Sequence, residues 1–133
     1  MASCTLPRAL AQQLLQIAQQ QAGVEVCGLI GGQQQLQSVY PISNIATHPT
    51  TEFLLDPSEQ IAAMRQMRQR GEDLLAIYHS HPSSEPSPSA RDLAAAEYRE
   101  ALYLIIGQTT SGQKIQGYKL LKTGPEPVQL VIQ

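Results

Sequence analysis

The chain has few cysteines, little net charge and no long apolar run, and each scarcity excludes a class of protein. Two cysteines, Cys4 and Cys27, are too few for a disulfide framework, which favours a reducing cytoplasm. A formal net charge of −2 without blocks of like charge argues against nucleic acid or a membrane surface as partner. No apolar run approaches the roughly 20 residues of a membrane span, and the first residues lack the apolar core of a signal peptide. A cytoplasmic protein is therefore expected.

The length of 133 residues predicts one domain, spanning residues 1–133, with a single core. Apolar residues at helical spacing predict helices over 5–22, 57–70 and 89–100. Short apolar or alternating runs predict strands over 24–30, 36–42, 51–55, 72–79, 101–106, 115–121 and 128–132, with a turn at Gly31–Gly32. The expected fold is α/β, with a mixed sheet flanked by helices.

Two histidines follow the apolar run 74–78, which predicts a short buried strand. Side chains two apart in a strand point to the same side, so His79 and His81 can reach one ion together. Asp92 follows after a proline-punctuated loop, where a helix pattern starts. Two imidazoles and one carboxylate are typical of a catalytic zinc site, which leaves a fourth position for water.

Each part of this stretch also has a plainer interpretation. An isolated pair of histidines two apart is more often a chance pattern or a satisfied core pair. Ser89 and Asp92 have the spacing of a helix N-cap and an acid at the third helical position, a near relative of the capping box. The two interpretations of Asp92 are compatible, because a ligand carboxylate gains from a rigid helix start.

The string His79 to Asp92, H-x-H-x7-S-x-x-D, resembles the motif of JAMM (MPN-plus) metallopeptidases. That family also has a glutamate in an upstream segment, to which Glu25–Gly32 (E-V-C-G-L-I-G-G) is similar, and Phe53–Pro57 is similar to its strand end before the second helix. The resemblance covers nearly the whole chain. It implies the cytidine-deaminase-like layered fold of JAMM/MPN domains, in the compact form of prokaryotic members.

The resemblance also implies a role for each matching residue. His79, His81 and Asp92 would bind Zn²⁺, although such a ligand set can also hold iron. Glu25 would be the general acid and base, and Ser89 would stabilise the oxyanion. The spacing alone predicts only the metal site. Cys27 is expected to be buried near this site without being a ligand, and His48 is expected to be a surface residue and not a ligand.

Compact members of this kind act on ubiquitin-like proteins, including β-grasp sulfur carriers with a Gly-Gly tail. The resemblance therefore implies a zinc-dependent isopeptidase or peptidase that cuts at such a tail. A non-catalytic MPN scaffold that binds partners, or a peptidase of cell-wall or phage-type peptides, stays open. A zinc deaminase is disfavoured because the chain has no C-x-x-C. The sequence leaves a homodimer open.

Overall fold

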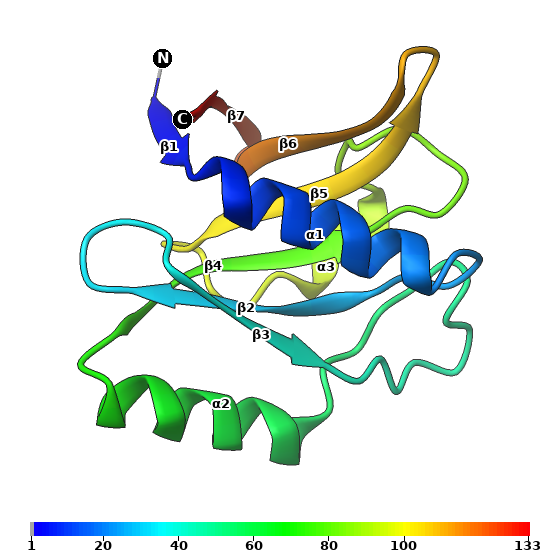
Figure 1. Ribbon diagram of the computed structural model, residues 1–133. Helices are drawn as coiled ribbons and strands as arrows, with labels where there is room; N and C mark the ends of the chain where they lie inside the picture. Colours follow the sequence, from blue (N-terminus) through cyan, green and yellow to red (C-terminus); the bar gives the residue numbers. More distant parts are fainter. Residues whose placement is uncertain (1) are drawn as a thin grey trace.

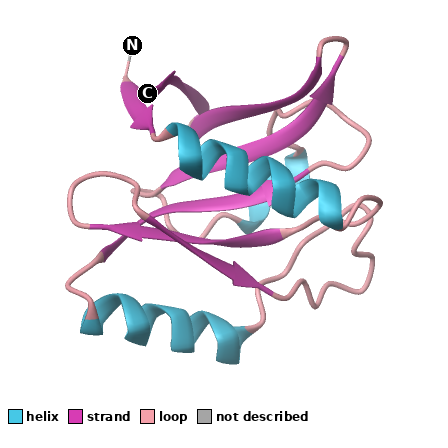
Figure 2. Cartoon of the chain, in the orientation of Figure 1, coloured by secondary structure: helices cyan, strands magenta, loops and turns pink. Residues whose placement is uncertain are grey.

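The computed structural model describes residues 2–133, which form a seven-stranded sheet and three helices (Figures 1 and 2). The elements are β1 (Ser3–Leu6), α1 (Arg8–Gln20), β2 (Cys27–Gly32), β3 (Ser38–Ile42), α2 (Pro57–Gln69), β4 (Asp73–Ser80), α3 (Ala90–Ala95), β5 (Leu102–Thr109), β6 (Gly112–Leu121) and β7 (Gly124–Ile132). None of the helices within residues 2–133 is long and apolar enough to cross a membrane.

The sheet is mixed, as the sequence predicts, with strand order β1-β7-β6-β5-β4-β2-β3. β4 pairs in parallel with β5, and β1 pairs in parallel with β7, whereas the other neighbours are antiparallel. The antiparallel pairing of β2 with β3 confirms the predicted hairpin. β4 and β5 are flanked by other strands on both sides, so the end of β4 lies in the interior of the sheet.

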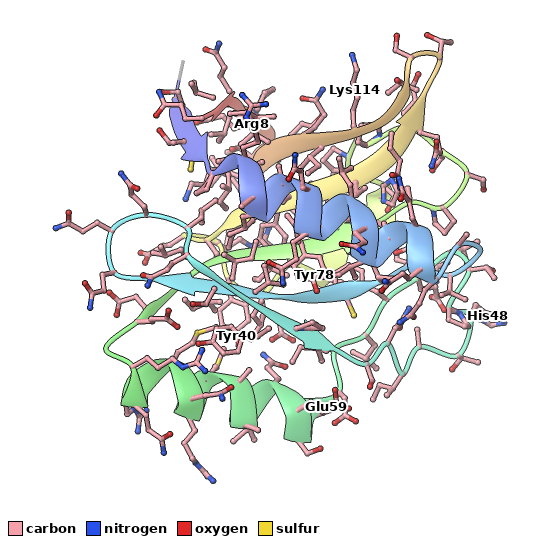
Figure 3. All side chains as sticks on the ribbon, in the orientation of Figure 1. Arg8, Tyr40, His48, Glu59, Tyr78 and Lys114 are labelled. Carbon is pink, nitrogen blue, oxygen red and sulfur yellow. The ribbon has the colours of Figure 1, made fainter. Side chains whose placement is uncertain are left out.

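Alternation along the central strands divides the core between the two faces of the sheet. Ala76 and Tyr78 of β4 belong to one apolar cluster, which includes α1, and Ile77 between them belongs to another, which includes α2. The two-residue period of a strand produces this division. α1 lies across one face and α2 packs beside β2, β3 and β4, as Figures 1 and 2 show, while in Figure 3 Tyr78 lies within the sheet and His48 at the periphery. By the same period His79 points toward the α2 side.

The predicted helix over 5–22 is wrong at its start. Residues 3–6 form β1, which pairs with β7 in the register Ser3 to Gln129, and α1 begins only after Pro7. The buried Leu6 fits helical spacing as well as it fits a strand. Because the partner strand lies at the other end of the chain, local spacing could not reveal this pairing.

Other predicted elements also differ from the structure. The expected turn at Gly31–Gly32 lies inside β2, and the chain turns over 33–37 instead. Residues 51–55 form no strand, and only an isolated bridge joins Asn44 to Leu55. α3 ends at Ala95, well before the predicted residue 100. On α2, Met67 is buried, whereas Ile61 is 59% exposed and does not face the core.

Gly107 belongs to β5, which extends beyond the predicted strand end at residue 106, and its lack of a side chain has a structural reason. A Cβ atom at Gly107 would lie 2.3 Å from the backbone nitrogen of Pro86. The loop after β4 therefore lies directly against β5, where the amide of Gln108 donates to the carbonyl of Ser84 at 2.8 Å. This contact holds the segment that runs from the histidines to α3.

A buried carboxylate holds the link between α2 and β4 against β3. Glu72 accepts hydrogen bonds from the Ser38 hydroxyl at 2.6 Å and the Tyr40 hydroxyl at 2.5 Å. Arg70 in turn donates to the Tyr40 hydroxyl at 3.1 Å. The hydrogen bonds from Ser38 and Tyr40 lower the pKa of Glu72, because they favour its charged form.

Replacing Glu72→Gln is expected to lower the free energy of unfolding at neutral pH by about 1–3 kcal/mol, since charge-assisted hydrogen bonds are lost. The lowered pKa means that this stabilisation is present above the pKa of an unfolded glutamate, about 4.3, and is lost as the pH falls through the folded value. Urea denaturation at several pH values measures it, with Glu126→Gln as an exposed control. A difference that does not shrink at acid pH would contradict this account.

Candidate metal centre

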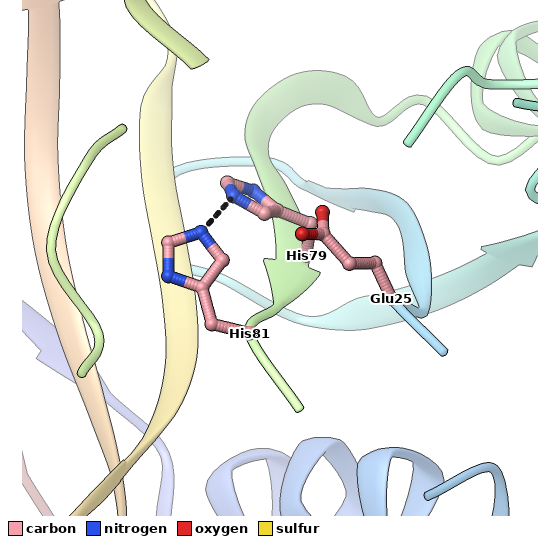
Figure 4. A group of neighbouring side chains, drawn as sticks. All are labelled: Glu25, His79 and His81. Atoms are coloured by element: carbon pink, nitrogen blue, oxygen red, sulfur yellow. Dashed lines mark hydrogen bonds between the residues drawn. The ribbon is translucent and has the colours of Figure 1, made fainter. Parts of the chain in front are cut away.

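Four buried polar side chains converge at the carboxyl end of β4. His79 is the penultimate residue of β4 and His81 follows the strand, while Asp92 lies in the first turn of α3. Glu25 precedes β2, the neighbouring strand. One carboxylate oxygen of Glu25 and one nitrogen of each histidine lie within 4.8 Å of one another (Figure 4). The structure thus brings together residues that are far apart in the sequence.

His79, His81 and Asp92 form a compact triangle. The two Nε2 atoms lie 3.2 Å apart, and each lies 3.1 Å from Asp92 Oδ2. Ligand atoms bonded at about 2.0–2.1 Å to one tetrahedral ion lie about 3.3–3.4 Å from one another. The triangle therefore has nearly the size that three ligands of one such ion require. The prediction that both histidines point to the same side is confirmed, while their role as ligands stays a prediction.

The hydrogen bond of His81 Nδ1 determines which nitrogen of this ring is available to bind a metal. His81 Nδ1 lies 2.9 Å from the carbonyl oxygen of Glu85, which can only accept a hydrogen bond, so Nδ1 carries the proton. The Nε2 lone pair is then free for an ion. A backbone carbonyl in this place is the usual outer partner of a metal-binding histidine. Glu85 belongs to the loop that packs against β5 at Gly107, where a side chain would clash with it.

His79 is held by a different contact. Its ring is fully buried and stacks on Phe53, with ring centroids 4.4 Å apart and an interplanar angle of 21°. His79 Nδ1 has no hydrogen-bond partner among residues 2–133. Stacking therefore fixes the ring plane without choosing its protonated nitrogen. The sequence showed Phe53 only as part of a family-like strand end, and its contact with His79 was not predicted.

Ser89 and Asp92 form the capping box that the plainer interpretation predicted. Ser89 Oγ accepts from the amide of Asp92 at 3.0 Å, and Asp92 Oδ2 accepts from the amide of Ser89 at 3.0 Å. The same Oδ2 completes the triangle with the histidines. A cap and a ligand are thus compatible in one residue, because the cap fixes the carboxylate that faces the imidazoles.

Burial and hydrogen bonding set the charges of the cluster. Burial raises the pKa of Glu25 to about 7 and lowers the pKa of His79, which favours the neutral ring that binds metals. Burial also opposes charge on Asp92, but the two imidazoles donate hydrogen bonds to it when their Nε2 atoms are protonated, which holds the pKa of Asp92 well below its usual range. Burial lowers the pKa of His81, but the hydrogen bonds to Asp92 and to the carbonyl of Glu85, together with the charges of Asp92 and Glu25, outweigh burial and raise it.

Two residues near or outside the cluster behave as expected from the sequence. Cys27 is buried and its thiol donates to the carbonyl of Ile42 at 3.4 Å. Burial and the charges of Glu25 and Glu59 raise the pKa of Cys27 to about 12, so the thiol stays protonated at neutral pH and is no nucleophile. His48 lies on the surface, 3.3 Å from Glu52 Oε1.

A largely apolar pocket opens beside His79 and Asp92. Its walls come from the segment before α2, from α3 and the residues after it, and from the sheet, and they include Phe53, Leu55, Ile77, Ala96, Tyr98 and Leu120. Gln60 and Tyr98 both line this pocket, and the side-chain amide of Gln60 donates to the Tyr98 hydroxyl at 2.7 Å. A pocket of this kind next to convergent polar groups is typical of a site that binds part of a substrate.

Comparison with known sequences points to one group of hydrolases. Residues 7–119 match a family described as prokaryotic homologs of the JAB domain. The chain is 38% identical over 84 residues to a desampylase from Haloferax volcanii, an alignment that covers 61% of this chain and only 60% of that protein. It is 35% identical over 102 residues to a probable TtuB-protein conjugate cleaving protease from Thermus thermophilus, covering 77% of this chain and 68% of that protein.

A further relative is also named a peptidase, and two solved structures share the fold of this chain. A CysO-cysteine peptidase from Mycobacterium tuberculosis is 29% identical over 115 residues, covering 82% of this chain and 78% of that protein. A protein from Desulfitobacterium hafniense has a TM-score of 0.88 and 30% identity, over 98% of this chain and 92% of that chain. A JAB1/MPN domain protein from Archaeoglobus fulgidus has a TM-score of 0.63 and 17% identity, over 98% and 100% of the two chains, and shows the shared fold alone.

The triangle predicts which carboxylate holds a metal ion. The Asp92→Ala variant is expected to lose the ion, because one of three ligands is gone, whereas the Glu25→Ala variant should keep about one ion per chain. Elemental analysis after dialysis against a low zinc concentration measures this, on protein purified without a metal-binding tag. Metal lost from the Glu25 variant and retained by the Asp92 variant would show that the histidines use the other carboxylate.

Proposed function

The chain belongs to the family of prokaryotic homologs of the JAB domain, and we propose that it is a zinc-dependent isopeptidase or peptidase. Its substrate would be the amide bond at the Gly-Gly tail of a ubiquitin-like or sulfur-carrier protein. The observation that carries the proposal is the buried convergence of Glu25 with the triangle of His79, His81 and Asp92. The names of relatives, which refer to TtuB-protein conjugates and to CysO-cysteine, support the substrate class.

In this proposal His79, His81 and Asp92 hold the zinc ion, and the donor set suits it. Two neutral imidazole nitrogens and a carboxylate oxygen are the ligands of catalytic zinc sites, which keep one position open. When bound, zinc would supply Lewis acidity, which polarises an amide carbonyl and lowers the pKa of water so that hydroxide is available as the nucleophile at neutral pH. The outer contacts from Glu85 and Phe53 keep the two rings in place for this task.

Glu25 moves the proton in this scheme. Its carboxylate lies beside the histidines and its Oε1 is buried without a hydrogen-bond partner among residues 2–133, so this oxygen is free to accept a proton. It takes a proton from the attacking water as the bond from oxygen to the carbonyl carbon forms. It then delivers that proton to the amine nitrogen as the carbon–nitrogen bond breaks. The products are a free carboxylate tail and an amine.

Ser89 supplies the hydrogen bond to the developing negative charge. Its Oγ accepts from the amide of Asp92, which leaves its own hydroxyl hydrogen available to donate. The residue is exposed at the start of α3 and is hydrogen-bonded to Asp92, which lines the pocket, so a substrate carbonyl can reach it. Loss of one such donor typically lowers the rate on the order of 10²–10³-fold.

Cleavage of a carrier fusion tests this function. Zinc-loaded protein is expected to release a reporter from the Gly-Gly tail of a β-grasp carrier protein, and Glu25→Gln should lower kcat on the order of 10²–10⁴-fold while the bound metal is retained. The exposed Glu126→Gln variant is the matched control and should cleave like the wild type. Wild-type protein that carries metal yet cleaves neither fusions nor isopeptide adducts of several such carriers would refute the proposal.

A further inference from the structure

The side-chain amide of Asn44 uses its full hydrogen-bonding capacity on the backbone around it. Asn44 Nδ2 donates to the carbonyl oxygens of Glu25 and Glu52, both at 2.9 Å. Asn44 Oδ1 accepts from the amides of Ala46 and Leu54, both at 3.0 Å. A primary amide has two donors and one oxygen with two lone pairs, so all four are matched. This side chain therefore cross-links the segment 44–54 to the backbone of Glu25.

The segment 44–54 forms hydrogen bonds with both the backbone amide and the backbone carbonyl of Glu25. The amide of Glu25 donates to the carbonyl of Pro49 at 2.8 Å, and the carbonyl of Glu25 accepts from Asn44. The segment is closed on itself by the amide of Ile45, which donates to the carbonyl of Leu54 at 2.9 Å. Because β2 begins only at Cys27, these two hydrogen bonds take the place of the strand pairing that Glu25 lacks.

The position of the Glu25 carboxylate depends on these backbone hydrogen bonds. Its Oε1 is buried and finds no hydrogen-bond partner within residues 2–133. The backbone of Glu25 must therefore place the carboxylate beside His79 and His81. On the other side, the amide and carbonyl of Val26 pair with Ser80 Oγ at 2.9 Å and the Ser80 amide at 3.0 Å, which fixes the next residue to β4.

The same amide also fixes the residue that stacks on His79. Asn44 binds the backbone of Glu52 and Leu54, the two neighbours of Phe53. Phe53 packs its ring on His79. The segment is held to α3 as well, by an ion pair between Glu52 and Arg91. One side chain outside the metal cluster thus sets the position of the carboxylate and of a ring that orients a histidine.

We propose that Asn44 is a positioning residue that holds Glu25 in place for proton transfer, an inference that rests on the function proposed above. Its four side-chain hydrogen bonds all go to backbone groups outside the three residues of the triangle. Its loss should impair the chemical step without removing the metal. Preorganisation of this kind matters because a misplacement of about 1 Å can cost on the order of 10²-fold in rate.

Asn44→Asp separates the two halves of the amide. An aspartate keeps an oxygen that can accept from Ala46 and Leu54, but its second oxygen faces the carbonyls of Glu25 and Glu52 and cannot donate. Asn44→Ala removes all four bonds without adding charge and serves if the aspartate variant does not fold. Ser38→Ala, which loses one hydrogen bond to Glu72 far from the cluster, is the control for general destabilisation.

Hydrogen exchange tests, without any substrate, whether Asn44 maintains the hydrogen bonds between the segment 44–54 and the backbone of Glu25. In either Asn44 variant the amide of Glu25 is expected to exchange at least about tenfold faster, while the amides of Leu29 and Ile30 in β2 stay protected. Ser38→Ala should leave the Glu25 amide as it is in the wild type. Unchanged exchange at Glu25 in a folded Asn44 variant would overturn the inference.

Kinetics on a carrier fusion test the consequence for catalysis. Asn44→Asp is expected to lower kcat on the order of 10²-fold at unchanged KM and unchanged metal content. In a Glu25→Gln background the same substitution should cause no further fall, because Asn44 acts through Glu25. An equal fall in both backgrounds, or wild-type kcat in Asn44→Asp, would overturn the inference even where Glu25→Gln shows the lowered kcat that the proposed function expects. A wild-type protein that cleaves no carrier would instead refute the proposed function, and hydrogen exchange would still decide the role of Asn44.

Discussion

The structure depends on the approach of three polar atoms, the two imidazole nitrogens and the Asp92 oxygen, to within 3.1–3.2 Å of one another in a buried place. Burying such groups costs free energy unless each is satisfied. One metal cation can be bound by all three atoms at once. Without a cation, hydrogen bonding can satisfy them only if an imidazole nitrogen carries a proton and shares it with the other two atoms. The surrounding fold can be understood as what brings these atoms together and keeps them there.

Each polar side chain of the cluster is held by a different kind of structure. A strand period aligns His79 with His81, and a carbonyl of the loop packed on Gly107 fixes the protonated nitrogen of His81. The capping box of α3 orients Asp92. Glu25 alone has no regular element to hold it, and hydrogen bonds from the segment 44–54 take that place. In the proposed mechanism the residue that moves protons is therefore the one supported by a loop.

Local patterns predicted much of this arrangement, because strand period, helix caps and turn residues act over a few positions. The shared side of His79 and His81, the cap formed by Ser89 and Asp92, and the mixed α/β sheet were all predicted and are seen. Contacts between distant segments could not be read in this way, such as the pairing of β1 with β7 or the stacking of Phe53 on His79. The proximity of Glu25 to the histidines was expected only from the resemblance to a family, since its own surroundings in the sequence are ordinary for a solvent-exposed glutamate.

A crystal structure of zinc-loaded protein, with anomalous diffraction collected on both sides of the zinc absorption edge, tests the central claim most directly. The account predicts one zinc peak per chain at about 2.0–2.1 Å from His79 Nε2, His81 Nε2 and Asp92 Oδ2, with Glu25 beside the ion but outside its bonds. A peak bonded to the carboxylate of Glu25 in place of Asp92, or no peak among these residues, would contradict it.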